Sequence, residues 1–196
     1  KGLGAAIYFP DNSIWAGASG ISSANPNVDI TTDDAFLIGS VTKTITSACI
    51  LQLADEGLIT LEDSLGMWLD TLPVIDPNGY INRKVTIRQL LRHQSGIYDV
   101  LSHPNNQPTL LSDISQIWTP EALIEEFISP ALFAPGATWS YSNTNYFLLA
   151  MIIKKVTGQP FYEVYRERFF EPIDLQEIAI PAFEPLLPPV AHVWLD

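Results

Sequence analysis

The sequence predicts an α+β fold, and three observations lead to that prediction. Two β-prone runs separated by a turn lie near the start of the chain, and a series of segments with helix start and stop signals follows them. No internal repeat or interdomain linker interrupts the 196 residues, of which 47% are hydrophobic and 16% charged. Strands followed by many helices are typical of α+β proteins, and this composition suits one compact unit with a substantial core.

The first predicted elements are a hairpin and a long helix. "GAAIYF" (4–9) and "IWAGAS" (14–19) flank the turn-rich tetrapeptide "PDNS", which favours an antiparallel hairpin. A polar loop is expected next, at "NPN" (25–27). Apolar residues then recur with helical spacing at 41, 45, 48, 49 and 53, so a helix is expected to begin at Ser40. Gly57 stands where its C-terminal cap belongs.

Shorter helices with explicit start signals are predicted along the rest of the chain. Each begins at an N-cap residue or a proline and several end at a glycine, as helices commonly do. A long polar loop is expected at 99–118, and loops of that length are usually functional. The predicted helices are 61–69 after Thr60, 87–94 after the capping box of Thr86 and Gln89 and ahead of Gly96, 121–128 after Thr119 and Pro120, 146–157 before Gly158, and 161–170 after Pro160.

Charge and composition exclude several function classes. The net charge of −12 and the isoelectric point near 4.4 argue against nucleic-acid binding, which needs a basic surface, and acidity here indicates solubility. The longest apolar run, Tyr146 to Ile153, is far shorter than the roughly 20 residues of a membrane-spanning helix. The single Cys49 excludes an internal disulfide and a cysteine-built metal site, and its place in the helical pattern predicts core packing. No metal or cofactor is predicted.

Ser40 and Lys43 are the first candidate catalytic residues. They lie three residues apart at a predicted helix start, so both side chains share one helix face. A serine is a poor nucleophile unless a neighbouring group takes its proton, and a lysine one turn away can do so. Backbone N–H groups at a helix start can also stabilise an oxyanion. Taken alone, the pattern favours a simple helix cap, because serine is a common N-cap residue.

A second segment, "TWSYSNTNY" (138–146), favours the catalytic interpretation of Ser40 and Lys43 over a simple helix cap. It places Tyr141 and Asn143 just ahead of the predicted buried helix, on a loop where neither has an evident core role. A phenol relays a proton once a nearby cation lowers its pKa from about 10. A carboxamide offers both a donor and an acceptor, which suits a substrate amide or the positioning of a lysine.

Together these motifs resemble the serine hydrolases of the β-lactamase and penicillin-binding-protein superfamily. The resemblance is carried by "GSVTKTIT" (39–46), "TIRQLLRHQSGIYD" (86–99) and "YSNTNYFLLAMIIKKVTGQPFYEVYRERFFEPIDL" (141–175), in the family's order over nearly the whole chain. The similarity is greatest to the branch with a Y-x-N second motif, which contains D-alanyl-D-alanine carboxypeptidases, D-aminopeptidases, class C β-lactamases and related esterases. It implies a β-lactamase/transpeptidase-like fold, with an antiparallel sheet flanked by helices and a mainly helical subdomain.

The resemblance also implies roles for four residues. Ser40 is expected to be the acylated nucleophile, Lys43 to help deprotonate it, and Tyr141 to pass the proton to the leaving group. Asn143 is expected to bind the acyl-side amide of the substrate. The Ser40 N–H would supply half of the oxyanion hole, and residues 36–39 would form a buried lead-in to the serine.

One departure concerns the family's third motif, [KH]-[ST]-G, which does not occur after Gly158. The chain is therefore expected to be a single catalytic unit that lacks the C-terminal part of its sheet. Residues 1–60 would form the sheet start and nucleophile helix, 61–175 the helical region, and 176–196 the return toward the sheet. A two-stranded start with no sheet to join would expose a large apolar face. The chain begins at Lys1 without a methionine or signal peptide, so a processed or trimmed form is expected.

The function expected from these features is hydrolysis through an acyl-enzyme. The preferred substrates are peptides with a D-residue, followed by esters in a promiscuous esterase and then β-lactams. The alternative from another class is a non-catalytic ligand-binding module, favoured by the missing third motif. The expected partner is a small-molecule or peptide substrate, the oligomeric state stays open, and the resemblance implies a periplasmic or secreted protein.

Several other residues invite a functional interpretation but are more simply explained by structure. His93 is expected to cap or pack a helix, because no acid or nucleophile is spaced to suit it. Tyr98 and Asp99 are expected to shape a loop, with the cleft rim as the alternative, and Asp33 and Asp34 a solvated turn. His103 and His192 are isolated, and the aromatic residues Trp118, Trp139 and Tyr146 are expected in the core.

Overall fold

The structure is a computed structural model that describes residues 1–196 except 25, 71–75, 114–115, 182, 186–189 and 192–196. His192 lies outside the described residues. The chain forms two compact units, the first made of residues 1–41 and 175–196 and the second of residues 42–174. The helix that contains Lys43, which the sequence analysis grouped with the strands, belongs to the second unit.

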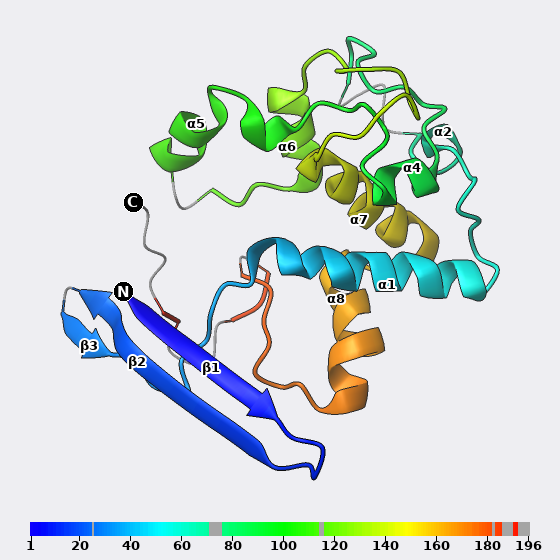
Figure 1. Cartoon of the computed structure of the whole chain (residues 1–196). Helices are drawn as coiled ribbons and strands as arrows, with labels where there is room; N and C mark the ends of the chain where they lie inside the picture. Colours follow the sequence, from blue (N-terminus) through cyan, green and yellow to red (C-terminus); the bar gives the residue numbers. More distant parts are fainter. Residues whose placement is uncertain (25, 71–75, 114–115, 182, 186–189, 192–196) are drawn as a thin grey trace. The chain divides into compact units, whose positions relative to one another are not determined.

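The first unit contains the predicted hairpin. Strand β1 (Gly2–Tyr8) pairs antiparallel with β2 (Ile14–Ala24), with Gly2 opposite Gly20 and Tyr8 opposite Ile14 (Figure 1). The turn between them closes through Asn12, whose N–H donates to the Phe9 carbonyl and whose φ of 65° is one that asparagine tolerates better than most residues.

A third strand was not predicted. Strand β3 (Asn27–Asp29) pairs antiparallel with β2, with Ala24 opposite Asn27 and a register irregularity between Ile21 and Ser23. Of the polar loop expected at 25–27, Asn27 therefore belongs to a strand, and residue 25 lies outside the described residues. A strand of three residues has too few positions to show the alternation of apolar and polar side chains. Further along, Asp34 accepts hydrogen bonds from the Thr31 N–H and hydroxyl, so the predicted turn at Asp33 and Asp34 is confirmed.

Many apolar side chains of this unit face solvent. The lead-in residues Phe36, Leu37 and Ile38, which were expected to be buried, are about half exposed, so that prediction is wrong for the described chain. Ala35 forms a parallel bridge with Val190, and the Ala191 N–H donates to the Ala35 carbonyl at 2.9 Å. Exposed large apolar residues on the strands are Leu3, Ile7, Tyr8, Ile14, Trp15 and Val28.

The second unit is helical. Helix α1 (Thr42–Asp55) begins directly after the 3₁₀ turn η1 (Gly39–Val41) and is followed by a Schellman motif at Gly57, whose φ is +73°. Its other helices are α2 (Leu65–Trp68), α4 (Ile87–Leu91), η2 (Val100–Ser102), α5 (Asn106–Ser112), α6 (Pro120–Phe127), α7 (Asn143–Thr157), α8 (Phe161–Tyr165), the π-helical turn η3 (Arg166–Phe170) and η4 (Glu171–Ile173).

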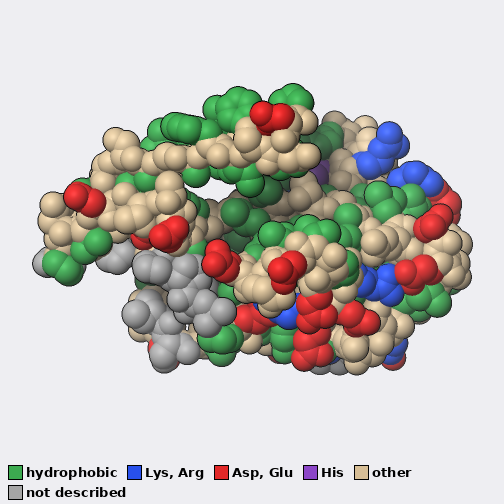
Figure 2. Space-filling model, turned by 90° about the horizontal axis from the view of Figure 1, so that it is seen from below, with side chains coloured by type: hydrophobic (Ala, Val, Ile, Leu, Met, Phe, Trp, Pro, Cys, Tyr) green, Lys and Arg blue, Asp and Glu red, His purple; other side chains and the backbone are tan. Residues whose placement is uncertain are grey.

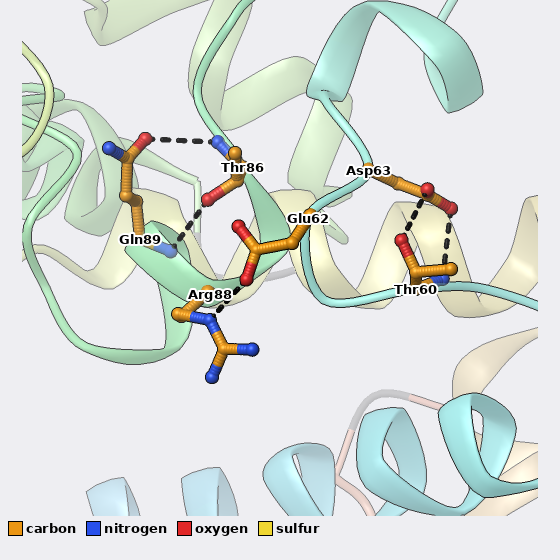
Figure 3. Close-up of polar contacts among 6 residues, drawn as sticks. All are labelled: Thr60, Glu62, Asp63, Thr86, Arg88 and Gln89. Carbon is orange, nitrogen blue, oxygen red and sulfur yellow. Dashed lines mark hydrogen bonds and ion pairs between the residues drawn. The ribbon is translucent and has the colours of Figure 1, made fainter.

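The predicted N-caps show where local signals suffice. The capping box of α4 is present, with the Gln89 N–H donating to the Thr86 hydroxyl and the Thr86 N–H donating to the Gln89 side chain (Figure 3). Thr119 caps α6 through its hydroxyl alone, which accepts from the Ala122 N–H, and Pro120 follows at the first helical position. Thr60 does not start a helix, because its N–H and hydroxyl bind Asp63 in a turn (Figure 3) and α2 begins only at Leu65.

The expected polar loop at 99–118 is also partly helical, since η2 and α5 lie within it. Helix α5 was not predicted, because it begins without a side-chain cap and its polar sequence shows no apolar periodicity.

Helix α7 is the centre of the second unit. It packs against α1, α4, α6 and α8 (Figure 1). A helix that is apolar on most of its circumference has to be buried, and Leu148, Leu149, Ile152 and Ile153 are fully buried. It ends as predicted at Gly158, with φ of +76° and its N–H donating to the Lys154 carbonyl. Cys49 is fully buried as predicted, and burial raises the pKa of its thiol to about 11.

Within the described residues, no helix is both long enough and apolar enough to cross a bilayer. On the face in Figure 2, Asp and Glu side chains are scattered over much of the surface and Lys and Arg are few, in keeping with the net charge of −12.

Candidate active site

Lys43 and Asn143 meet in the second unit although they are one hundred residues apart in the sequence. Lys43 lies in the first turn of α1, and its ammonium donates to the Asn143 carboxamide oxygen at 2.7 Å. The same ammonium lies over the rings of Tyr141 and Tyr146, with Nζ 5.1 Å and 5.5 Å from the two centroids. Aromatic faces attract cations, so all three partners hold the charge in one place.

Tyr141 shares the acceptor of Lys43. Its hydroxyl donates to the Asn143 carboxamide oxygen at 3.4 Å, a longer and weaker contact than the one from Lys43. Asn143 is the first residue of α7 and not a loop residue as predicted, because the helix begins three residues before its apolar run. The structure therefore brings together three of the four candidate residues, Lys43, Tyr141 and Asn143.

Ser40, the fourth candidate, lies in the first unit. It is exposed and is the middle residue of η1, in which the Val41 N–H donates to the Ile38 carbonyl. In the chain it precedes α1 by two residues and Lys43 by three.

The carboxamide of Asn143 is held from its other end by Asp99. One Asp99 oxygen accepts from the Asn143 backbone N–H at 3.1 Å, and the other accepts from its side-chain nitrogen at 3.0 Å. The two oxygens also accept from the Leu101 N–H and the Ser102 hydroxyl at the start of η2. Asp99 thus links the Lys43–Asn143 contact to the segment that follows α4.

His93 packs directly against Tyr141. The two rings are stacked, with centroids 4.6 Å apart and planes 28° apart, and the Tyr146 ring lies 5.3 Å from the imidazole. The His93 Nδ1 accepts from the Ser142 backbone N–H at 3.1 Å, so this nitrogen carries no proton and the neutral ring is protonated at Nε2. The backbone φ of His93 is +54°, a region where few side chains other than His, Asn and Asp occur.

The surroundings favour the neutral imidazole. Burial lowers the pKa of His93 below its ordinary value, the positive charge of Lys43 lowers it further, and the negative charge of Asp99 acts in the opposite direction. His93 was expected to cap or pack a helix, and it does pack, but onto the tyrosine of the candidate site.

Backbone hydrogen bonds join the loop that carries His93 and Asp99 to the loop before Tyr141. The Ser140 N–H donates to the His93 carbonyl at 3.0 Å, and the Leu132 N–H donates to the Gly96 carbonyl at 2.8 Å. Gly96 has φ of +75°, and a Cβ there would lie 2.0 Å from the Phe133 carbonyl oxygen, so only glycine fits.

Sequence reasoning missed two residues of this site and misplaced a third. Asp99 and His93 belong to "RHQSGIYD", a segment that carried part of the resemblance, yet their partners are 44 and 49 residues away and leave no local pattern. Trp139 was expected in the core but is 61% exposed, with its ring centroid 6.2 Å from that of His93 and the two planes 75° apart.

Comparison with known proteins identifies the family of the chain. Residues 1–195 match the family model described as Beta-lactamase. The chain belongs to the β-lactamase family. The predicted resemblance and the predicted fold class are thereby confirmed, since solved structures of the β-lactamase and penicillin-binding-protein fold superpose on this member of the family.

Three relatives of this β-lactamase family member indicate the range of its similarities. It is 31% identical over 188 residues to penicillin-binding protein 4 of Amycolatopsis lactamdurans, covering 91% of this chain and 45% of the relative. It is 29% identical over 164 residues to the lovastatin esterase of Penicillium rubens, covering 74% of this chain and 39% of that protein. A D-stereospecific amidohydrolase from a Streptomyces species superposes with a TM-score of 0.74 at 34% identity, covering 90% of this chain and 50% of the other. The chain spans half or less of the length of each.

Proposed function

We propose that this protein is a serine hydrolase that forms an acyl-enzyme at Ser40 and cleaves amides or esters, with D-residue peptides and amides as the preferred class. The observation that carries the proposal is the convergence of the Lys43 ammonium and the Tyr141 hydroxyl on one oxygen of Asn143. Core packing gives no reason for a lysine, a tyrosine and an asparagine to converge in this way, whereas proton transfer to and from a serine does.

Chain connectivity brings Ser40 within reach of this group. Three residues span at most about 11 Å when fully extended, so the Ser40 Cα cannot lie farther than that from the Lys43 Cα. The covalent chain thus limits the separation of the nucleophile from the proton-transfer pair.

The proposed acylation starts from the form of the Lys43–Tyr141 pair that has lost one proton, as a lysine amine or a tyrosine phenolate. The Ser40 Oγ bonds to the substrate carbonyl carbon while its proton passes to that deprotonated group. The carbonyl electrons move to the oxygen, where the Ser40 backbone N–H donates to the oxyanion. As the C–N or C–O bond breaks, the leaving group receives a proton from Tyr141. Water then attacks the Ser40 ester, gives its proton to the same pair, and Ser40 leaves with a proton restored.

Asn143 has two tasks in this scheme. Its oxygen holds Lys43 and Tyr141, and its nitrogen carries two hydrogens, one of which binds Asp99. We assign the second hydrogen to the acyl-side amide of the substrate, as the resemblance implies. The proposed steps use only side chains, backbone and water.

The substrate class is supported by the relative described as a D-stereospecific amidohydrolase, which is 34% identical to this chain. The similarity to a lovastatin esterase supports the second candidate, a promiscuous esterase. A matched set of substrates with the same acyl group separates the two: a D-residue anilide, its L-isomer and the corresponding ester. Preference for the D-anilide over the L-anilide favours the first, and hydrolysis of the ester alone favours the second. We also propose a periplasmic or secreted site of action.

The deciding experiment is intact-mass analysis of the full protein after incubation with benzylpenicillin, with the Ser40→Ala variant as control. A stoichiometric adduct that maps to Ser40 and is absent from the variant is the expected result. A persistent adduct indicates slow deacylation, whereas rapid release of ring-opened penicillin indicates a β-lactamase. No adduct, together with ester and anilide hydrolysis unaffected by Ser40→Ala, would overturn the proposal and favour a non-catalytic binding module or another nucleophile.

A further inference from the structure

The carboxylate of Asp99 is fixed by donors on two sides. From its own loop it accepts the Leu101 N–H at 3.2 Å on Oδ1 and the Ser102 hydroxyl at 3.3 Å on Oδ2. From α7 it accepts the Asn143 backbone N–H on Oδ1 and the Asn143 side-chain nitrogen on Oδ2. Each oxygen therefore has one partner in each segment, which leaves the carboxylate little freedom to rotate.

This arrangement decides which way the Asn143 carboxamide points. An ionised carboxylate only accepts hydrogen bonds, and an ammonium only donates them. With the nitrogen of Asn143 toward Asp99, its oxygen faces Lys43 at 2.7 Å, so both contacts are favourable. The reversed amide would set an oxygen against the carboxylate and an NH₂ group against the ammonium, and both contacts would be repulsive.

We propose that Asp99 is a positioning residue that fixes the orientation of the Asn143 carboxamide, so that its oxygen is the acceptor for Lys43 and Tyr141. The effect on catalysis rests on the proposed hydrolase function, whereas the orientation of the amide does not. Asp99 itself touches no reacting atom in the proposed steps; it acts through Asn143.

The competing explanation is that Asp99 serves only as the N-cap of η2, since the Leu101 N–H donates to it. Asp99→Asn separates the two roles. The asparagine keeps one oxygen for the Leu101 and Asn143 backbone N–H groups, so the cap is preserved. Its NH₂ group then faces the Asn143 nitrogen, where two donors oppose each other, and the Asn143 amide is driven to turn over.

The test compares Asp99→Asn with a matched control in the full protein. Asp63→Asn is the control, because Asp63 is also a loop carboxylate that accepts from a backbone N–H and from side chains, those of Thr60 and Trp68 (Figure 3 shows the Thr60 contacts). For Asp99→Asn we expect kcat to fall about 10- to 100-fold with KM changed less than about threefold, as for a misplaced catalytic group. Asp63→Asn should leave both constants within about twofold of the wild type.

A double-variant cycle tests whether the effect passes through Asn143. In the Asn143→Ala background there is no carboxamide to orient, so adding Asp99→Asn should change kcat by less than about twofold. Groups that act through each other are non-additive in this way, whereas an independent capping role would lower the rate by the same factor in both backgrounds. An additive result, or wild-type kcat in Asp99→Asn, would overturn the proposal.

Side-chain amide NMR tests the orientation without using activity. The Asn143 NH₂ signals, assigned by their loss in Asn143→Ala, should exchange slowly with solvent in the wild type and at least several-fold faster in Asp99→Asn. Asp63→Asn should leave their exchange unchanged. Unchanged exchange in Asp99→Asn would refute the positioning role even in an active enzyme. Faster exchange in a protein that forms no Ser40 adduct, and whose ester and anilide hydrolysis is unaffected by Ser40→Ala, would instead retain the orientation and refute the proposed function.

Discussion

Replacing Gly96 by alanine should damage both the stability and the activity of this protein. The glycine has φ of +75°, where an L-residue costs about 1 kcal/mol or more. The added Cβ would lie 2.0 Å from the Phe133 carbonyl oxygen and 2.9 Å from its carbon, both of them backbone atoms. Relief requires the two loops to separate, which threatens the hydrogen bond from the Leu132 N–H to the Gly96 carbonyl.

The expected loss in the free energy of unfolding is about 3 to 5 kcal/mol. It combines about 1 kcal/mol for the positive φ, about 1–3 kcal/mol for overpacking and about 1 kcal/mol for the strained hydrogen bond. Gly158→Ala is the matched control, because Gly158 has nearly the same φ of +76° but open space where the added methyl group would lie, with nothing within 4 Å. That variant should lose only about 1 kcal/mol.

Thermal and urea unfolding of the two variants measure the difference. At about 2–4 °C per kcal/mol, Gly158→Ala should lower Tm by a few degrees and Gly96→Ala by about 6 °C or more. Gly96→Ala should also lower kcat at temperatures where it remains folded, because His93 and Asp99 lie within three residues of the displaced position. Equal stability losses in the two variants would refute the reasoning, since they share the backbone strain and differ only in the clash.

Three further predictions test the site and its support. Lys43→Met should raise the pKa of His93 toward its ordinary value, because the lysine charge opposes the imidazolium; NMR titration that shows no upward shift would contradict this electrostatic account. Thr86→Ala should lower the free energy of unfolding by about 1 kcal/mol through loss of the capping box, and urea denaturation with an unchanged midpoint would count against it. Tyr165→Phe should cost about 1 kcal/mol, because the buried Tyr165 hydroxyl donates to Thr46 at 2.8 Å; thermal unfolding at the wild-type Tm would show that this bond contributes nothing.

The elements predicted correctly are those that are determined by residues close together in the sequence. The hairpin follows from the turn at residues 10–13, and α4 from a capping box that needs only Thr86 and Gln89. Thr60 shows the limit of such signals, since its side chain binds Asp63 in a turn although the same residue type caps α6 at position 119. Strand β3 pairs with residues 21–24 of β2, which are close to it in the sequence, but its three residues are too few to show the alternation that identifies a strand.

The candidate site shows the same division between local and distant causes. Lys43, Tyr141 and Asn143 were identified from motifs, and the structure brings the three together. Asp99 and His93 were assigned ordinary loop and packing roles, because hydrogen bonds across 44 and 49 residues become visible only once α7 is packed. Motifs identify residues whose type is associated with catalysis. They do not identify residues such as Asp99, which matter because they contact and position another side chain of the site.

The alternation of charge along Lys43, Asn143 and Asp99 explains why an asparagine suits the middle position. A carboxylate there would bind the ammonium so strongly that the charged form of the lysine would be favoured over the neutral amine, which opposes proton transfer from it. It would also face Asp99 as a second negative charge. The neutral carboxamide gives the lysine an acceptor without a charge and gives the aspartate a donor, so one side chain satisfies both neighbours. In the proposed mechanism, a proton would then move between Lys43, Tyr141 and the serine without breaking an ion pair, while Asp99 orients the carboxamide that Lys43 and Tyr141 bind.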